Sequence, residues 1–226
     1  MKDTCTNKLE NKKLLKKKAI LDAAAKVFAE KGYLDTSIKN ITDEASISVG
    51  SFYSYFTTKE EVLEQIYIEI LDMTLKLASD ASMNPDDSNA KKFTLSMTSA
   101  VWTYVKNKEL SKVLLVKSMG INELFEKKRW EVLDKTNAFL RKILLHLKEC
   151  DSANIQDVDV TSVLLTQSIF GVITYWIDEK LTSDLKDTIF TLCTYHLRAM
   201  NIDFKDEEIT QCINEVLTSD YEKFLK

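Results

Sequence analysis

Apolar positions recur at three- and four-residue spacing along most of the chain, which predicts a succession of amphipathic helices. Strand-type alternation is nearly absent, and the 226 residues include four glycines and a single proline. We therefore expect an all-α protein of about nine to ten helices. The first helix should run over about 15–31, with Gly32 where a helix C-terminal glycine belongs. The clearest loop is 83–89, which holds the proline.

Two short helices joined by a tight turn are predicted in residues 36–59, which read TSIKNITDEASISVGSFYSYFTTK. Ile38 and Ile41 recur at the spacing that buries one face of the first of these helices. Ser48 follows the turn and can offer its hydroxyl to the free amides of the second helix, expected over 49–56. The exposed face of this second helix has a small, hydrogen-bonding start and an aromatic end, which suits a helix-turn-helix that reads DNA.

The block 16–59 resembles the DNA-binding domain of the TetR family of transcriptional regulators. The matching segments are ILDAAAKVFAEKGY, TSIKNIT and SVGSFYSYF followed directly by TTKEEVL, in the family's order and spacing. The resemblance implies a three-helix, helix-turn-helix DNA-binding domain over 1–58 and a helical ligand-binding and dimerisation domain over 59–226. Two positions depart from the family pattern: Ser46 replaces the usual turn glycine, and Thr42 replaces a common alanine. Ser46 would have to tolerate a near-left-handed backbone at a modest cost.

The paired tyrosines Tyr53 and Tyr55 match the family's phosphate-contacting pair, although partly buried packing residues would give the same pattern. Lys39 occupies the second-helix position from which family members often reach a base in the major groove. Lys59 opens the connecting helix, so its ammonium and the free amides of that helix could hold one phosphate oxygen. A simply solvated lysine would also explain Lys59.

Small residues at the start of the recognition helix extend the predicted DNA-contacting surface. Gly50 lets the backbone approach DNA closely, and Ser51 can donate a hydrogen bond to a base or accept one. Thr36 and Ser37 could contact phosphate, although helix capping alone would explain both residues.

Charge is distributed unevenly along the chain. The net charge is -4, but residues 1–59 carry eleven lysines against seven carboxylates, giving +4, so the remainder carries -8. A basic head on an acidic body directs one end of a protein toward phosphate. The lysine run 16–18 could add nonspecific electrostatic binding or only solubility. The N-terminal segment is charged without an apolar core, so we expect a frayed basic arm and not a signal peptide.

The chain shows no catalytic constellation, so an enzyme is not expected. His146 and His196 are the only histidines, and the sequence lacks HExxH, HxxxH and CxxC spacings. Metal or histidine-driven chemistry therefore lacks its components, and we expect no metal and no cofactor. The cysteines lie too far apart for a metal knuckle and suit a reducing cytoplasm. They are Cys5, Cys150, Cys193 and Cys212.

Aromatic and sulfur-bearing residues on the helices of the body could line a largely apolar cavity, which is where family members bind their inducer. For any one of these residues, ordinary core packing is the alternative explanation. The candidate ligand-contacting residues are Met97, Trp102, Met119, Phe125, Trp130 and Tyr175, and Met73 and Phe139 belong to the same group.

Two predicted helices, 157–180 and 184–200, are apolar over more of their circumference than the outer helices of a monomer should be. They could pair with their symmetry mates in a four-helix bundle, which matches how the family dimerises. The alternative is burial against the chain's own helices. The candidate interface residues are Phe170, Ile173, Trp176, Ile177, Phe190, Cys193 and Leu197.

The stretch 160–177 has no charged residue and is close to the length that a bilayer requires. Threonine, serine and glutamine residues interrupt it. We therefore expect a helix buried on most sides within the protein and no membrane span.

These features together predict a ligand-responsive transcriptional regulator, expected to be a repressor. It would bind a palindromic DNA operator as a homodimer, because two recognition helices specify a site that one short helix cannot. A small, largely apolar or aromatic effector would release it. Two alternatives stay open: a regulator controlled by a protein partner, and a helical carrier or enzyme with a vestigial reader domain.

Overall fold

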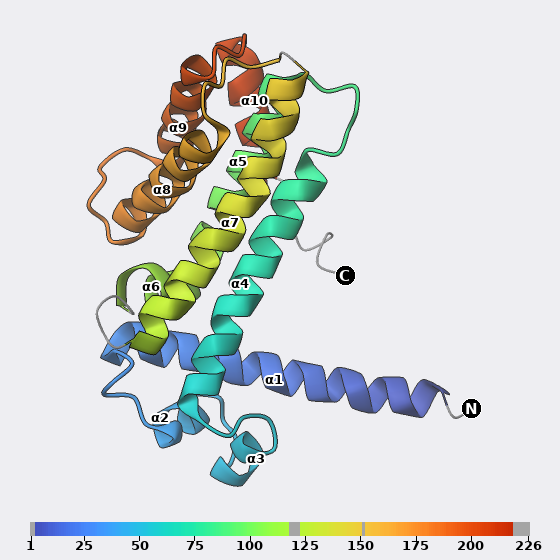
Figure 1. Ribbon diagram of the computed structural model, residues 1–226. Coiled ribbons are helices and arrows are strands. Elements are labelled where there is room, and N and C mark those ends of the chain that lie inside the picture. The colour runs from blue at the N-terminus through green and yellow to red at the C-terminus, as the bar shows by residue number, and fades with distance from the viewer. Residues whose placement is uncertain (1–2, 118–122, 151, 219–226) are drawn as a thin grey trace. The chain divides into compact units, whose positions relative to one another are not determined.

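The computed structural model describes residues 3–117, 123–150 and 152–218 (Figure 1). Within these residues the chain forms ten α-helices and one π-helical turn, η1, and no strand. The predicted all-α fold is therefore confirmed. The chain divides into two compact units: the first unit comprises Met1–Glu69 and Glu109–Glu126, and the second unit comprises Ile70–Lys108 and Lys127–Lys226. The first unit is thus larger than the domain expected over 1–58.

The first unit contains three complete N-terminal helices, the start of a long fourth helix and a short later segment. Its helices are α1 (Asp3–Lys31), α2 (Ile38–Glu44), α3 (Val49–Tyr53), α4 (Lys59–Ala81, as far as Glu69), α6 (Lys108–Lys112, from Glu109) and η1 (Val113–Lys117). The core residues Ile20, Ala24 and Phe28 of α1 are fully buried, as are Ile41 of α2 and Phe52 of α3. The α1 residues recur at the four-residue spacing expected of an amphipathic helix.

The basic N-terminal segment is helical, because α1 already begins at Asp3. The frayed arm expected ahead of residue 15 is therefore replaced by an extension of the helix. Leu14 and Leu15 of this extension are exposed.

The second unit is organised around α5. Its helices are the remainder of α4, α5 (Asn89–Lys106), α7 (Glu123–Glu149, from Lys127), α8 (Val158–Ile177), α9 (Leu185–Ala199) and α10 (Asp206–Thr218). Helix α5 contacts α8, α9 and α10, and ten of its 18 residues are buried. Side chains of Ser88, Asp157 and Asp184 cap the first turns of α5, α8 and α9, which satisfies amides that a helix start leaves free. The predicted loop with the proline lies between α4 and α5.

Helix α8 has two different apolar faces. By length and composition it is the one described helix that could cross a membrane, but Leu165, Ile169 and Ile173 are buried in a helix that contacts α5 and α9. Its other face exposes Val160 and Leu164. The helix is therefore a core helix on one side only, and not buried on most sides as the sequence suggested.

Candidate nucleic-acid interface and ligand cavity

Helix α2 begins with a reciprocal cap. The Ser37 hydroxyl accepts a hydrogen bond from the Asn40 amide at 3.2 Å, and Asn40 Oδ1 accepts one from the Ser37 amide at 3.0 Å. Ser37 remains exposed, so its hydroxyl stays at the surface. Thr36 is buried, and its hydroxyl donates to the carbonyl of Gly32 at 2.7 Å. The Thr36 side chain therefore belongs to the fold and is not available to phosphate.

The turn between α2 and α3 has the left-handed residue that the sequence predicts. Ser46 has φ 54°, its amide donates to the carbonyl of Asp43, and the Ile47 amide donates to that of Thr42 at 3.0 Å. These two bonds form a Schellman cap, in which glycine is the usual left-handed residue. The other unusual residue, Thr42, is buried and donates its hydroxyl to the carbonyl of Lys39 at 3.0 Å. Both departures from the family pattern are accommodated locally.

Helix α3 presents an exposed end of the expected kind. Ser48 caps the helix by accepting the Ser51 amide at 3.1 Å. Tyr53 is 55% exposed, with its ring edge against Phe52, while Tyr55 and Ser51 are half-buried. Tyr53 is thus available at the surface, whereas half-buried Tyr55 also fits the alternative of a partly buried packing residue.

Gly50 is exposed in the first turn of α3 and has an ordinary negative φ. A Cβ added there would meet the Ser48 Oγ at 4.0 Å and nothing closer. The fold of the single chain therefore does not require glycine at this position. The close approach of DNA expected from the sequence would require it.

Lys59 is bound inside the first unit. Its ammonium donates to the carbonyls of Tyr33 at 2.9 Å and Thr36 at 2.9 Å, with a longer contact to that of Leu34 at 3.4 Å. The same ammonium lies 4.3 Å from the centre of the Tyr33 ring. An ammonium has three protons to donate, so this set of carbonyls can occupy all of them. The structure places Lys59 as a clamp on the loop before α2, and the expected phosphate contact would require it to leave that loop.

The neighbouring side chain completes this clamp. The Tyr33 hydroxyl donates to the Glu60 carboxylate at 2.6 Å, and this hydrogen bond lowers the pKa of Glu60 below its ordinary value because it stabilises the ionised form. The first turn of α4 is therefore fixed to the chain between α1 and α2 by two adjacent side chains.

Lys39 lies on the exposed surface of α2, as a base-reading residue should. Its ammonium pairs with Asp43 one turn further along at 2.9 Å, with both side chains mostly exposed. An exposed pair of this kind contributes about 0.5 kcal/mol or less, so it is easily exchanged for a DNA contact. Of the lysine run, Lys17 lies 5.6 Å over the Phe56 ring, while Lys16 and Lys18 are exposed.

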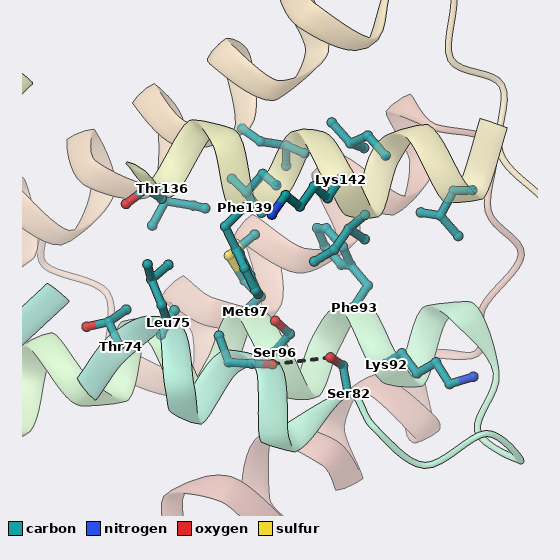
Figure 2. A pocket seen from close by; sticks show the side chains of 18 of the residues that line it. Thr74, Leu75, Ser82, Lys92, Phe93, Ser96, Met97, Thr136, Phe139 and Lys142 are labelled. Carbon is teal, nitrogen blue, oxygen red and sulfur yellow. Dashed lines mark hydrogen bonds between the residues drawn. The ribbon is translucent and has the colours of Figure 1, made fainter. Parts of the chain in front are cut away.

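The second unit contains a cavity of about 420 Å³ lined by residues of α4, α5, α7 and α8 (Figure 2). This volume lies within the roughly 300–1,000 Å³ that is usual for small-molecule sites. Apolar side chains dominate its wall, among them Leu75, Phe93, Met97, Phe139 and Phe170.

One of the six predicted ligand residues, Met97, lines this cavity. Trp102 packs against a separate buried cluster around Leu95, and Trp130 and Tyr175 are 53% and 56% exposed. These three are not cavity residues, because their helices turn them elsewhere. Met119 and the side chain of Phe125 lie outside the residues that the structure describes.

Five of the lining residues share one face of α5; Met97 was expected from the sequence and the other four were not. They fall at the three- and four-residue spacing of a helix face, which was a usable signal: Phe93, Ser96, Met97, Ala100 and Tyr104. The lining residues Lys92 and Lys142 gave no comparable signal, because surface lysines follow the same spacing.

Most of the predicted dimer residues are buried within the chain itself. Ile173, Ile177, Cys193 and Leu197 are at most 1% exposed, and Phe170 lines the cavity. The choice of these five as interface residues is therefore corrected: the most apolar face of each helix packs inward first. Trp176 and Phe190 stay partly exposed. The exposed apolar residues of α8 and α9 are instead Val160, Val163, Leu164, Tyr175 and Tyr195.

Comparison with known proteins agrees with this geometry. Residues 20–66 match the model of the bacterial regulatory proteins of the tetR family. The chain is 50% identical over 48 residues to the HTH-type transcriptional regulator YuxN of Bacillus subtilis, covering 21% of this chain and 16% of that protein. It is 27% identical over 144 residues to the HTH-type transcriptional repressor KstR2 of Rhodococcus jostii, covering 62% of this chain and 69% of that one. The match with YuxN thus spans only a small part of that relative.

Solved structures share the fold over most of the chain. The fatty acid degradation regulator FadR from Bacillus halodurans has a TM-score of 0.74 at 21% identity, covering 83% of this chain and 97% of that chain. FadR from Bacillus subtilis, in complex with stearoyl-CoA, has a TM-score of 0.70 at 22% identity, covering 79% and 96%. The capped α2–α3 pair is a helix-turn-helix, which is the reading element of one class of DNA-binding domains. Residues 20–66 therefore carry a DNA-binding domain of the TetR family.

Proposed function

We propose that this protein is a ligand-responsive repressor that acts in the cytoplasm. It binds a palindromic operator as a homodimer through α2 and α3, and it loses affinity for DNA when a small, largely apolar effector occupies the cavity of the second unit. The observation that carries this proposal is the exposed, hydroxyl-bearing end of α3, which follows a fully capped turn. Such an end is suited to phosphate contacts beside a helix that reads bases.

The roles of individual residues follow from their exposure. Tyr53 and Tyr55 hold phosphates, and Ser37 contributes a further hydroxyl from the start of α2. Lys39 reaches a base, while Gly50 and Ser51 form the close-contact end of α3. Two residues expected from the sequence are given structural roles instead, because Thr36 is buried and Lys59 is bound to carbonyls.

Dimerisation is assigned to the exposed side of α8 and α9. Val160, Val163 and Leu164 form an apolar strip there, and Tyr175 and Tyr195 extend it. Paired with its symmetry mate, this surface would make a four-helix bundle in which each copy contributes the same residues.

The effector is assigned to the cavity because of its size and wall. Bacillus subtilis FadR shares this fold and was solved with stearoyl-CoA, a ligand with a long apolar part. The wall of the present cavity, with Phe93, Met97 and Phe139, suits a ligand whose main contacts are apolar.

The proposed mechanism is a population shift. Helix α4 connects the cavity to the loop before α2. Its residues Leu75 and Ala78 line the cavity, and its residues Lys59 and Glu60 hold the loop. A ligand that prefers one position of α4 lowers the fraction of molecules that fit the operator, by no more than its difference in affinity for the two states.

Titration of labelled operator with the full chain tests the proposal. We expect affinity to fall steeply with added salt, because each phosphate contact releases a counterion. One sequence should also compete about a thousandfold better than unrelated duplex. Binding that is equal for all duplexes, or that does not depend on salt, would rule out an operator-binding repressor.

A further inference from the structure

Resting on the proposed function, we infer that the effector is an amphiphilic anion: an apolar chain that ends in a carboxylate or another anionic group. The chain lies along the apolar wall of the cavity. The anionic group lies at the accessible rim of the cavity, where the ammonium groups of Lys142 and Lys92 attract it.

The charge of the cavity wall is one-sided. Among the described lining residues, the basic side chains are Lys92, Lys142 and His146. No described lining residue carries a carboxylate. Asp87, in the loop before α5, is paired with Lys91 at 2.8 Å. An anionic group at this wall thus gains attraction without meeting a like charge.

The basic side chains reach different parts of the cavity: in Figure 2 Lys92 lies at the end near Ser82, and the ammonium of Lys142 lies near the middle, beside Phe139. Lys92 lies in the first turn of α5, just after the loop that begins at Ser82, and His146 lies one turn beyond Lys142 near the end of α7. Figure 2 shows Ser82 and Lys92 at one end of the cavity, and Thr74 and Thr136 at the other.

The basic side chains also belong to the accessible part of the cavity wall. Lys142 and His146 are exposed and Lys92 is half-buried, whereas the Thr74 end includes the fully buried Tyr104. A ligand can therefore keep its charged group near water while its chain is buried, which avoids the cost of burying a charge.

Both lysines can still donate to a ligand. Lys92 gives one hydrogen bond to the carbonyl of Pro85 at 3.1 Å, which leaves two of its three protons. Apolar surface would bind any greasy chain equally well, so these ammonium groups are what would select an anionic chain over a neutral one. A charge-assisted hydrogen bond changes affinity by about tenfold or more.

The test measures binding of four ligands that share one chain length to the full-length protein by calorimetry. They are dodecanoate, dodecanol, dodecylamine and dodecanoyl-coenzyme A. Dodecanoate should bind about tenfold more tightly than dodecanol, and dodecylamine most weakly. If dodecanoyl-coenzyme A is tighter still, the anion is the phosphate-bearing thioester; if it is weaker, the anion is the free acid.

Two variants assign the preference to its residues. Lys142→Gln and Lys92→Gln should each reduce the preference for dodecanoate over dodecanol by about threefold or more, and leave the affinity for dodecanol unchanged. Lys135→Gln is the matched control, because Lys135 is an exposed lysine of α7 that does not line the cavity. This control should behave as the wild type.

The outcomes separate the inference from the proposed function, because operator binding is measured in the same samples. Equal binding of dodecanoate and dodecanol, both releasing the operator, would overturn the anionic class and leave the ligand-responsive repressor standing. Absence of binding by every chain, with operator binding intact, would overturn the amphiphile. Loss of preference in the Lys135→Gln control would show that the effect is general surface charge, which also overturns it.

Discussion

The two units of this protein assemble their candidate sites from residues at different separations along the chain. In the first unit, Thr36, Thr42 and Ser48 bond to backbone groups within four residues. In the second unit, Ser168 of α8 meets His196 of α9 at 2.7 Å, and cavity residues come from four helices.

The difference follows from helix length. Helices α2 and α3 have seven and five residues, and helices this short are not stable in water without further support. Their hydroxyls are therefore used in local caps, and what remains exposed on α3 is available to DNA. The long helices of the second unit are held by packing, so the composition of the cavity wall depends on which helix faces meet.

Lys59 is the exception, because it connects residues that are far apart in the sequence of the first unit. Its substitution is expected to give the largest change in stability. Lys59→Met keeps the apolar stem near Tyr33 but removes the ammonium from the carbonyls of Tyr33 and Thr36. Hydrogen bonds to a charged group contribute about 1.5–3 kcal/mol. We expect the free energy of unfolding to fall by about 2–3 kcal/mol in urea denaturation.

Lys39→Met is the matched control for this substitution. The Lys39 ammonium is bound to Asp43 at the surface, so the loss should be about 0.5 kcal/mol or less. If both variants lose the same amount, Lys59 is not a clamp, and its proposed role in transmitting the ligand signal fails with it.

Substitution of the tyrosines tests whether the exposed hydroxyl groups of the first unit bind DNA. The double variant Tyr53→Phe, Tyr55→Phe keeps both rings and removes two hydroxyls. Affinity should fall by about a hundredfold for operator and unrelated duplex alike, because phosphate contacts do not depend on sequence.

Ser51→Ala is the contrasting variant. It should change the preference between duplex sequences and lower the general affinity little. Thermal melting of all three proteins should coincide, since Tyr53 is largely exposed. Unchanged DNA affinity in the double variant would remove the tyrosines from the interface.

The first unit was largely predictable because its determinants are close in sequence. The order of capping serines, apolar positions and a left-handed turn residue is readable from one short stretch, and Ser46 indeed has φ 54°. The contacts of Lys59 could not be predicted from the sequence, because its partners lie 23 to 26 residues away. No local pattern announces a contact with backbone carbonyls.

The second unit was predictable in class and not in its cavity. Side-chain type led to Trp130 and Tyr175, which are exposed, because neither composition nor type reports which helix faces meet. The face of α5 that carries Phe93 and Met97 was periodic and could have been chosen. The dimer residues failed for a related reason, since strong apolarity marks the face that the chain buries for itself.

A buried histidine in the second unit provides the next largest effect. Burial lowers the pKa of His196 from 6.5 to about 4, because the charged imidazolium is poorly solvated there. Between pH 6.5 and pH 4, His196 is therefore protonated in the unfolded chain and mostly neutral in the folded protein. Stability should therefore be fully present above pH 6.5 and decrease as pH falls toward 4, by about 2 kcal/mol.

His196→Gln should flatten that part of the stability profile. The comparison is between slopes, because loss of the Ser168 contact can lower stability equally at every pH. Urea unfolding of both proteins across this pH range gives the difference, with carboxylates contributing to both alike. Parallel profiles would mean that His196 takes up its proton as readily in the folded protein as in the unfolded chain.

The smallest expected change in stability concerns a left-handed backbone conformation that occurs in both units. Ser46 in the first and Asn201 in the second have φ 54° and 53°, a conformation that is unfavourable for most side chains and better tolerated by asparagine. Ser46→Gly should raise the free energy of unfolding by about 0.5–1 kcal/mol, the relief of strain exceeding the entropy that glycine adds to the unfolded chain. Asn201→Gly should gain less, because asparagine is already adapted to this conformation. Equal gains in thermal unfolding would show that serine and asparagine are strained alike, and that the turn before α3 bears no special cost for lacking glycine.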